Sequence, residues 1–247
     1  EGEPMKAGVA VADLFAGQNA VIAILAALQA RHLTGAGQHL DISLFDSELG
    51  WLANVASNYL ISGNLPKRHG NAHANIVPYQ SFRASDAWFV IAVGNDKQFE
   101  ALCKVIGKSE LGIHPRFVTN SARVENRDEL IALFEPVFAT RSASEWLDSL
   151  EKAEIPCGPI NNFEQVFSMP QVKEREMLIT MKHPTIGDLP LVGSALKMSD
   201  TPVEYRLPPP LMGEHTEEVL RELGFSSDQI SRLQISDSVK KGKQAGL

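Results

Sequence analysis

The chain has 247 residues, of which 44% are hydrophobic and 21% are charged, close to the values of ordinary globular proteins. This composition excludes collagen, coiled coils and wholly disordered chains, and the length suffices for one large domain or two small ones. Lysine and arginine total 23 against 30 acidic residues, a net charge of −7, which argues against nucleic acid or an anionic membrane as the main partner.

The front of the chain predicts two helices separated by a strand. Residues 17–31 form an apolar helix, and we expect little of it to meet water. Its longest uninterrupted apolar run, residues 20–28, is about half of the ~18 residues that a membrane span needs, so we expect no membrane partner. Alternation over 40–44 predicts a half-buried strand, and a second helix is expected over 46–61. The side chains expected to point inward from this second helix are Leu49, Leu52, Val55 and Ala56.

The middle of the chain predicts a loop, a hairpin and three helices. Glycine and proline within residues 62–66 end the second helix, and residues 67–75 form a polar loop. The strands of the hairpin are expected at 80–83 and 88–93. The three helices are expected at 96–106, 127–138 and 144–152, and Ser142 with Glu145 predicts a capping box before the last one.

The last third predicts short elements followed by a tail. Short helices are expected at 162–167 and 171–176, strands at 177–181 and 189–192, and a helix at 214–223 that stops at Gly224. From Gln234 onward the chain is polar and predicts a frayed tail. The first residue is Glu1, with no initiator methionine, signal peptide or transit pattern, and we expect the chain to be the back part of something longer.

Asp13 is the one carboxylate in an otherwise uncharged stretch, residues 8–17, just before the first helix. The structural interpretation is a helix N-cap, and the residues alone favour it because aspartate is a preferred cap. The functional interpretation is a nucleophile, since an ionised carboxylate can attack a thioester without a general base. Free amides at the helix start would then stabilise the oxyanion.

The loop at 68–75 holds a second concentration of polar residues. His69 and His73 lie four apart, but Gly70 separates them, Pro78 follows, and no carboxylate ligand is near in the sequence. We therefore expect no metal site. Glycine and asparagine suit a mobile loop that lies over a substrate.

The two cysteines offer little chemistry. Cys103 and Cys157 lie far apart and form no CxxC pair, which indicates a reducing compartment without a zinc or disulfide framework. We expect a cytoplasmic location, or the mitochondrial matrix in a eukaryote. Cys157 precedes Gly158-Pro159, a context that favours a tight turn over a reactive thiol. The residues alone indicate an α/β protein with one interesting aspartate.

Three blocks of motifs cover nearly the whole chain. The first runs from Ala12-Asp13 to Gly17 and continues with Thr34-Gly35-Ala36-Gly37-Gln38 and Asp41-Ile42-Ser43-Leu44. The second is Val77-Pro78-Tyr79, the hairpin after it and Gly94-Asn95. The third contains Gly158-Pro159-Ile160, Pro170-Gln171-Val172, His183-Pro184 and Gly213-Glu214-His215-Thr216. In this order they resemble the class III CoA-transferases, the family of formyl-CoA transferase and the carnitine CoA-transferases.

The resemblance implies an α/β fold with an incomplete Rossmann-like large domain, a smaller α+β domain and an interlocked homodimer for the full chain. Residues 1–65 would belong to the large CoA-binding domain and carry the catalytic aspartate. Residues 66–180 would form the linker loop and the small domain, and residues 181–247 would return to the large domain and end in the tail. Coenzyme A and acyl-CoA would bind as substrates together with a carboxylic acid, and no permanently bound cofactor is expected.

The resemblance also assigns roles to residues. The family's nucleophile falls on Asp13, which reverses the preference for a cap. The family's substrate loop falls on residues 70–77, and the substrate-binding residues it implies are Gly70, Asn71, His73, Asn75 and Val77. Where oxalate-using relatives carry glycines, this chain has residues 74–77 without glycine, which argues against oxalate or formate. The motifs look closest to the branch that uses dicarboxylic acyl groups, with succinyl-CoA as the expected donor.

The implied reaction is CoA transfer through an aspartyl anhydride and an aspartyl-CoA thioester. One alternative is the racemase branch of the same fold, whose second catalytic residue, a histidine, would lie before Glu1. Another is an inactive fragment that only folds or dimerises. Family chains carry most CoA contacts before the aspartate, so we expect these 247 residues alone to be inactive and poorly soluble.

Overall fold

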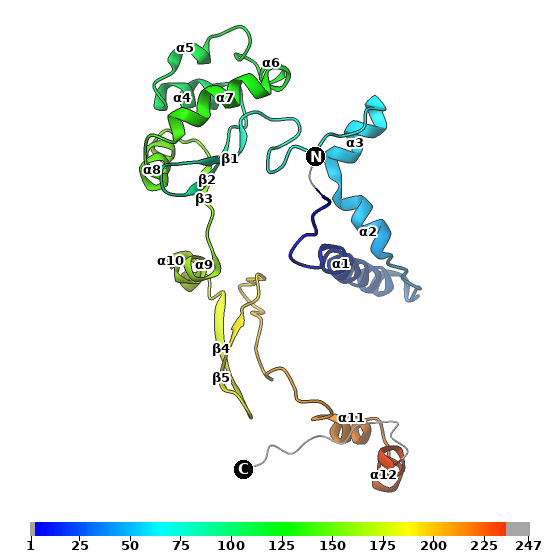
Figure 1. The fold of residues 1–247 in the computed structure, drawn as a ribbon. Helices are drawn as coiled ribbons and strands as arrows, with labels where there is room; N and C mark the ends of the chain where they lie inside the picture. Colours follow the sequence, from blue (N-terminus) through cyan, green and yellow to red (C-terminus); the bar gives the residue numbers. More distant parts are fainter. Residues whose placement is uncertain (1–2, 236–247) are drawn as a thin grey trace. The chain divides into compact units, whose positions relative to one another are not determined.

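A computed structural model describes residues 3–235 of the chain (Figure 1). The chain divides into two units, Glu1–Ile160 and Asn161–Leu247, which are described in turn. Both units combine helices with a small antiparallel sheet, so the expected α/β class is confirmed. The expected division into residues 1–65, 66–180 and 181–247 stays a prediction.

The first unit begins with three helices, α1 (Val11–Thr34), α2 (Leu44–Trp51) and α3 (Ala53–Ser62). Helix α1 is longer than predicted and ends at Gly35, whose φ of 76° is the left-handed conformation that glycine adopts without strain. The predicted second helix is split in two. Ala53, the first residue of α3, has a φ of 43°, a left-handed conformation that interrupts a right-handed helix, so α2 and α3 meet at a break.

The predicted strand at residues 40–44 is wrong. Residues 36–43 have no regular structure, and Leu44 begins α2 instead. The Ser43 side chain caps this helix, because its Oγ accepts a hydrogen bond of 3.2 Å from the Asp46 amide. A strand needs a neighbouring strand to accept its backbone hydrogen bonds, and no described strand pairs with this segment.

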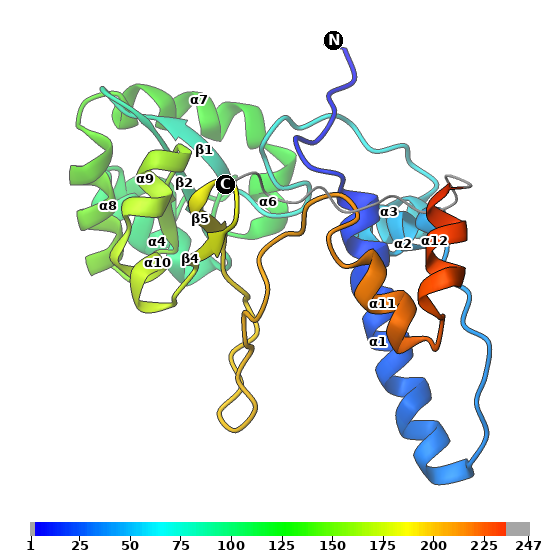
Figure 2. The same cartoon turned by 90° about the horizontal axis from the view of Figure 1, so that it is seen from below.

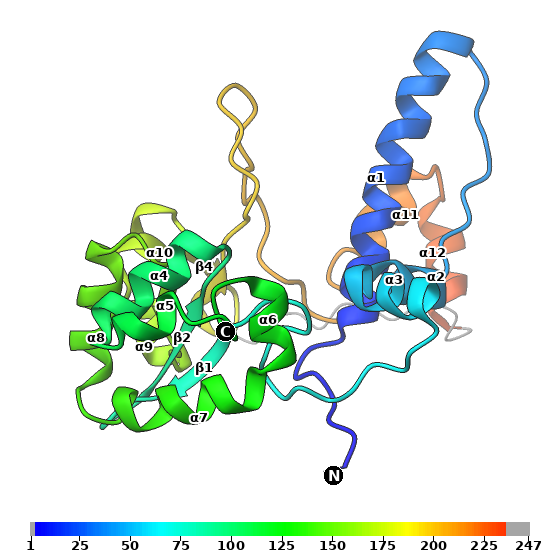
Figure 3. The same ribbon diagram turned by 90° about the horizontal axis from the view of Figure 1, so that it is seen from above.

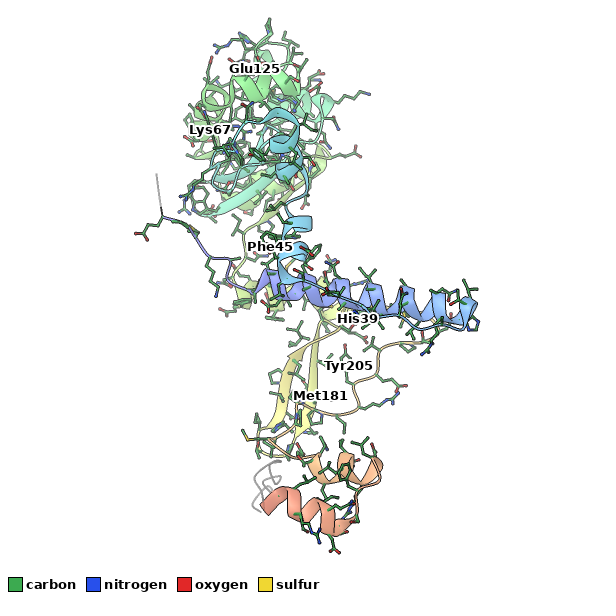
Figure 4. All side chains as sticks on the ribbon, turned by 90° about the vertical axis from the view of Figure 1, so that its right-hand side faces the viewer. His39, Phe45, Lys67, Glu125, Met181 and Tyr205 are labelled. Atoms are coloured by element: carbon green, nitrogen blue, oxygen red, sulfur yellow. The ribbon has the colours of Figure 1, made fainter. Side chains whose placement is uncertain are left out.

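The predicted burial of the front helices is also wrong. Within α1 only Ala16 is buried, and within α2 only Ser47; Asn19 Nδ2 donates to Ser47 Oγ at 3.1 Å and joins the two helices. Large apolar side chains project from α1 into the open (Figure 4). The exposed large apolar side chains of the segment from α1 to α3 include Leu14, Val21, Ile22, Leu25, Leu28, Phe45, Leu49, Trp51, Leu52, Val55, Leu60 and Ile61.

Helix α1 is long and apolar enough to cross a membrane by length and composition alone. The sequence analysis considered only the uninterrupted apolar run at residues 20–28, which Asn19 and Gln29 bound, and so missed the apolar character of the whole helix. Core helices of soluble proteins have the same composition. The absence of a membrane partner therefore stays a prediction.

The rest of the first unit is a three-stranded antiparallel sheet covered by helices (Figures 1 and 3). The hairpin β1 (Tyr79–Arg83) and β2 (Trp88–Ala92) is confirmed, and Phe82 faces Phe89 across it. The expected helices are confirmed as α4 (Asp96–Val105), α7 (Arg127–Phe138) and α8 (Ala143–Lys152). Two further short helices were not predicted, α5 (Ser109–Gly112) and α6 (Asn120–Glu125).

The third strand, β3 (Cys157–Pro159), corrects the predicted tight turn at Cys157. It pairs with β2 at the edge of the sheet, with Ile91 opposite Cys157. Only three residues long, it carries no alternation that could reveal a strand, and its partner is far away in the sequence.

This sheet and its helices enclose the hydrophobic core of the first unit. The core is rich in aromatic rings that meet edge to face or tilted, such as Phe138 against Trp146 at 5.3 Å. The Trp146 indole donates to the Phe138 carbonyl at 2.9 Å. The fully buried large side chains of this core include Phe82, Phe89, Phe99, Phe117, Phe134, Phe138, Leu102, Leu130 and Leu150.

The second unit contains short helices and one hairpin (Figure 2). Its helices are α9 (Phe163–Ser168), α10 (Pro170–Glu174), α11 (Thr216–Glu222) and α12 (Ser227–Ile235), and its hairpin is β4 (Leu178–His183) with β5 (Gly187–Val192). The expected helices and strands are confirmed within a few residues, and α12 was not predicted. The tail was expected from Gln234, but Gln234 and Ile235 belong to α12, and the remaining residues, 236–247, lie outside the described residues.

Candidate active site

Asp13 lies in the first turn of α1 and is exposed. The helix begins two residues earlier than this aspartate, with Ala10 at the N-cap position and no side-chain cap. The N-cap interpretation is therefore wrong. Within residues 3–235 no hydrogen bond or ion pair occupies the Asp13 carboxylate. The partial positive charge at the start of α1 favours an anion there.

The predicted substrate loop lies between α3 and β1. Gly70 has a φ of 60°, and a Cβ added there would meet no atom within 4 Å. Glycine is therefore favoured at this position by backbone conformation rather than by lack of space. The next residue, Asn71, is anchored to the hairpin, because its Oδ1 accepts a hydrogen bond of 2.9 Å from the Ser81 amide.

His73 and Asn75 are held more tightly than Gly70. The His73 amide donates to the Tyr79 carbonyl at 2.9 Å, and its ring stacks on the Tyr79 ring at 5.3 Å. The amide of Asn75 donates to His73 Nδ1 at 3.0 Å. The side-chain amides of Asn75 and Asn58 bond to each other in both directions, at 2.8 and 3.2 Å, which ties the loop to α3.

Val77 ends the loop and is completely buried. Its amide donates to Asn120 Oδ1 at 3.2 Å, and its carbonyl accepts from Arg123 Nε at 2.6 Å. The structure thus brings Asn71, His73, Asn75 and Val77 together in one hydrogen-bonded segment. The expectation of a mobile loop is not supported for residues 71–77, since most of them are anchored to neighbouring elements.

Three polar side chains of α6 and α7 anchor this loop, and sequence reasoning missed all three. Asn120 and Arg123 lie three residues apart, the spacing that places two side chains on one side of α6, and Arg127 is the first residue of α7. Arg127 Nη2 donates to the carbonyls of His73 and Ala74 at 2.9 and 2.8 Å. The spacing was visible in the sequence, but its target was not, because the loop is about fifty residues away.

The two arginines of this set differ in their surroundings. Arg123 is fully buried, with Nη1 bonded to the Phe117 carbonyl and Nη2 to Asp96 at 2.9 Å each, and it lies over the Phe99 ring. Burial lowers the pKa of the Arg123 guanidinium, and Asp96 opposes that shift. Burial likewise lowers the pKa of Arg127, whose Nη1 is buried without a hydrogen-bond partner in the described part of the chain.

A cavity of about 420 Å³ lies between the loop and α7. Polar side chains from both line it, among them His69, Asn71, Gln80 and Arg127. Asp128 and Glu135 line it as well, so its charges are mixed. No hydrogen bond or ion pair joins Asp13 to the loop within residues 3–235, and the pairing of nucleophile and loop stays a prediction.

The cysteines do not offer a competing nucleophile. Burial raises the pKa of the Cys157 thiol above its ordinary value, which disfavours the reactive thiolate. Across residues 3–235 no group of three or more histidine, cysteine or acidic side chains is placed to hold a metal ion. His69 and His73 are therefore not part of such a group among these residues. The absence of a bound metal or cofactor in the working protein stays a prediction.

Comparison with known proteins gives a consistent picture. The model of CoA-transferase family III matches residues 1–216. The chain is 40% identical to human succinyl-CoA:glutarate CoA-transferase and 41% identical to succinate–glutarate CoA-transferase of Agrobacterium fabrum, covering 90% of this chain in both cases. These matches cover 51% and 56% of the two relatives, so the chain spans about half their length. A crystal structure of a CAIB/BAIF family protein from Brucella suis is 45% identical with a TM-score of 0.71, over 90% of this chain and 58% of that one.

Proposed function

The chain belongs to CoA-transferase family III, and on this premise we propose that the protein containing it moves CoA from succinyl-CoA to a dicarboxylic acid. The observation that carries the proposal is the 40% identity to a succinyl-CoA:glutarate CoA-transferase over 90% of the chain. The family resemblance read from the sequence motifs is confirmed by this match.

We propose Asp13 as the nucleophile. A carboxylate oxygen of Asp13 attacks the thioester carbonyl of the donor, the C–S bond breaks, and a mixed anhydride and CoA thiolate result. The thiolate then attacks the aspartyl carbonyl of the anhydride, which releases the donor acid and leaves an aspartyl-CoA thioester. Asp13 is exposed in the first turn of α1, and its carboxylate oxygens have no partner in residues 3–235; both observations support this role.

The second half of the reaction reverses the first with a different acid. The acceptor carboxylate attacks the aspartyl thioester and expels CoA thiolate, and the thiolate attacks the acyl carbonyl of the new anhydride. The products are the acceptor's CoA thioester and free Asp13. Because anhydrides hydrolyse readily, the site must exclude water, and we assign that task to the loop of residues 70–77.

Assembly and location are part of the proposal. The exposed apolar faces of α1, α2 and α3 need a covering surface, and we propose that a homodimer of the full-length protein supplies part of it. Light scattering at micromolar concentration should give a dimer, and a monomer would contradict this. We further propose a cytoplasmic or mitochondrial-matrix enzyme without a resident cofactor.

Replacement of the nucleophile tests the function. In the full-length protein Asp13→Asn keeps the size of the side chain but removes the nucleophilic oxygen anion, and succinyl-CoA:glutarate transfer should fall by at least about a thousandfold. The fold should survive, as judged by an unchanged circular dichroism spectrum. Turnover at the wild-type rate would remove Asp13 as the nucleophile. Exchange of the α-proton of an acyl-CoA in deuterated water without CoA transfer would favour the racemase alternative.

A further inference from the structure

The corner between α6 and α7 presents three side chains to the backbone of residues 73–77. Asn120 Nδ2 donates to the Asn75 carbonyl at 2.8 Å, Arg123 Nε to the Val77 carbonyl, and Arg127 Nη2 to the carbonyls of His73 and Ala74. Every carbonyl named here belongs to the substrate loop. Side chains that bind backbone fix the path of the loop whatever its own side chains are.

Arg123 and Arg127 contribute to this corner in different ways. Arg123 has partners for Nε, Nη1 and Nη2, and two of them, Phe117 and Asp96, lie outside the loop, so it serves the core as well. Among the described residues, the hydrogen bonds of Arg127 all go to the loop, through Nη2 alone. Its Nη1 is buried without a partner in the described residues, an arrangement that a purely structural arginine would avoid.

The two carbonyls bound by Arg127 come from consecutive residues. In an extended chain successive carbonyls point in opposite directions, so a donor that reaches both shows that the backbone bends at Ala74, and it holds the peptide planes on either side of that residue. The second of these planes contains the Asn75 amide, which is bonded to the His73 ring. Loss of the guanidinium removes the restraint on both planes and leaves Asn75 held by Asn58 and Asn120 on its far side.

We propose that Arg127 is a positioning residue that holds loop residues 71–77 in the conformation that receives the acceptor carboxylate. The inference rests on the proposed function, because it takes this loop as part of the CoA-transferase site. It places the determinant of acceptor recognition outside the loop, at the first residue of α7. Arg127 also lines the cavity beside the loop, together with Asn71 and Gln80.

Hydrogen exchange tests whether Arg127 orders the loop, and this measurement does not require an active enzyme. In the full-length protein Arg127→Gln should speed exchange in a peptide spanning residues 71–77 by at least tenfold, while peptides from β2 and α4 stay unchanged. Arg116→Gln is the matched control. Arg116 bonds to Asn126 and Glu129 next to the start of α7 and makes no hydrogen bond or ion pair with the loop among the described residues, so this variant should leave loop exchange unchanged. Unchanged loop exchange in Arg127→Gln overturns the proposal whether or not the protein is a transferase.

Steady-state kinetics test whether Arg127 affects recognition of the acceptor acid. Arg127→Gln should lower kcat/KM for the acceptor acid at least tenfold while the KM for succinyl-CoA stays within twofold of wild type. Arg127→Lys, which keeps a cation on a shorter side chain, should restore both loop protection and acceptor kcat/KM in part. Faster loop exchange with unchanged acceptor kinetics would overturn the assignment of acceptor recognition to Arg127. If wild type and Arg116→Gln show no transfer at all, the proposed function fails, and so does this assignment of Arg127 to acceptor recognition.

Discussion

The two parts of the first unit use similar apolar side chains in opposite ways. In the sheet and helices from β1 to β3, Leu130 is completely buried, and so are its large aromatic neighbours. In α1, Leu25 is 61% exposed, although α1 is longer and more apolar than α7, the helix that carries Leu130. The difference teaches that an apolar pattern predicts a helix but does not supply the surface that buries it.

The physical reason lies in what each segment can reach. The residues from β1 to β3 form a sheet with an apolar face and the five helices α4 to α8, so the core closes within about eighty residues. Helices α1, α2 and α3 contact one another without enclosing an interior among the described residues. Their apolar faces are free for another protein surface.

The largest expected effect is the loss of a buried leucine. Leu130→Ala removes a fully buried side chain from α7 and should lower the free energy of unfolding by about 3 kcal/mol, through lost burial and the cavity left behind. Urea unfolding followed by the fluorescence of buried Trp146 measures it. A loss below about 1 kcal/mol would mean that this region is not the tightly packed core described above.

Alkaline pH should act on the core through Cys103. Burial raises the pKa of its thiol to about 12, above its value in the unfolded chain. The stabilisation is therefore complete below about pH 9 and is lost as the pH rises toward the folded value, approaching about 1.4 kcal/mol per pH unit. Urea titrations from pH 8 to 10.5 should show this loss in the wild type. In Cys103→Ala the slope should be shallower, and equal slopes would contradict the assignment.

The capping box of α8 should give a smaller effect. Ser142 Oγ accepts from the Glu145 amide at 3.3 Å, and a Glu145 carboxylate oxygen accepts from the Ser142 amide at 2.9 Å. Ser142→Ala should cost about 1 kcal/mol in the same urea assay. The control is Ser85→Ala in the exposed turn of the hairpin, which should change the stability by less than about 0.5 kcal/mol. Equal losses in both variants would contradict the capping role.

The smallest effect is expected for the matched leucine of α1. Leu25→Ala makes the same chemical change as Leu130→Ala, but at a 61% exposed site, and in the 247-residue chain it should change core stability by less than about 0.5 kcal/mol. The same urea assay with Trp146 fluorescence measures it. A loss similar to that of Leu130→Ala would show that α1 and the core unfold as one cooperative unit and would break the comparison.

The sequence predicted those parts of the fold that depend on near neighbours. The hairpin, α7 and the capping box of α8 follow from alternation, helical periodicity and cap residues within about a dozen positions. The predicted strand at 40–44 failed and β3 was missed for the same reason. A strand exists only where a partner offers hydrogen bonds, and local sequence does not reveal that partner.

The candidate site likewise combines features that nearby residues predict with features that depend on distant partners. Asp13 and the loop were singled out as candidates by their residues, and a family resemblance assigned their roles; the local cap argument for Asp13 was wrong because the helix begins at Val11. The anchors of the loop escaped prediction, since Arg123 and Arg127 have the composition of an ordinary charged helix face. Their burial and their bonds to distant carbonyls are set only when α6 and α7 pack beside the loop.

The central claim is that Asp13 becomes covalently linked during CoA transfer, and chemical trapping tests it most directly. The full-length protein is incubated with succinyl-CoA, quenched with hydroxylamine, digested and analysed by mass spectrometry. The account predicts a hydroxamate on the peptide that contains Asp13 in the wild type and its absence in Asp13→Asn. A succinyl adduct on the Cys157 peptide in a sample quenched with acid instead of hydroxylamine, or active transfer without any modification of Asp13, would contradict it.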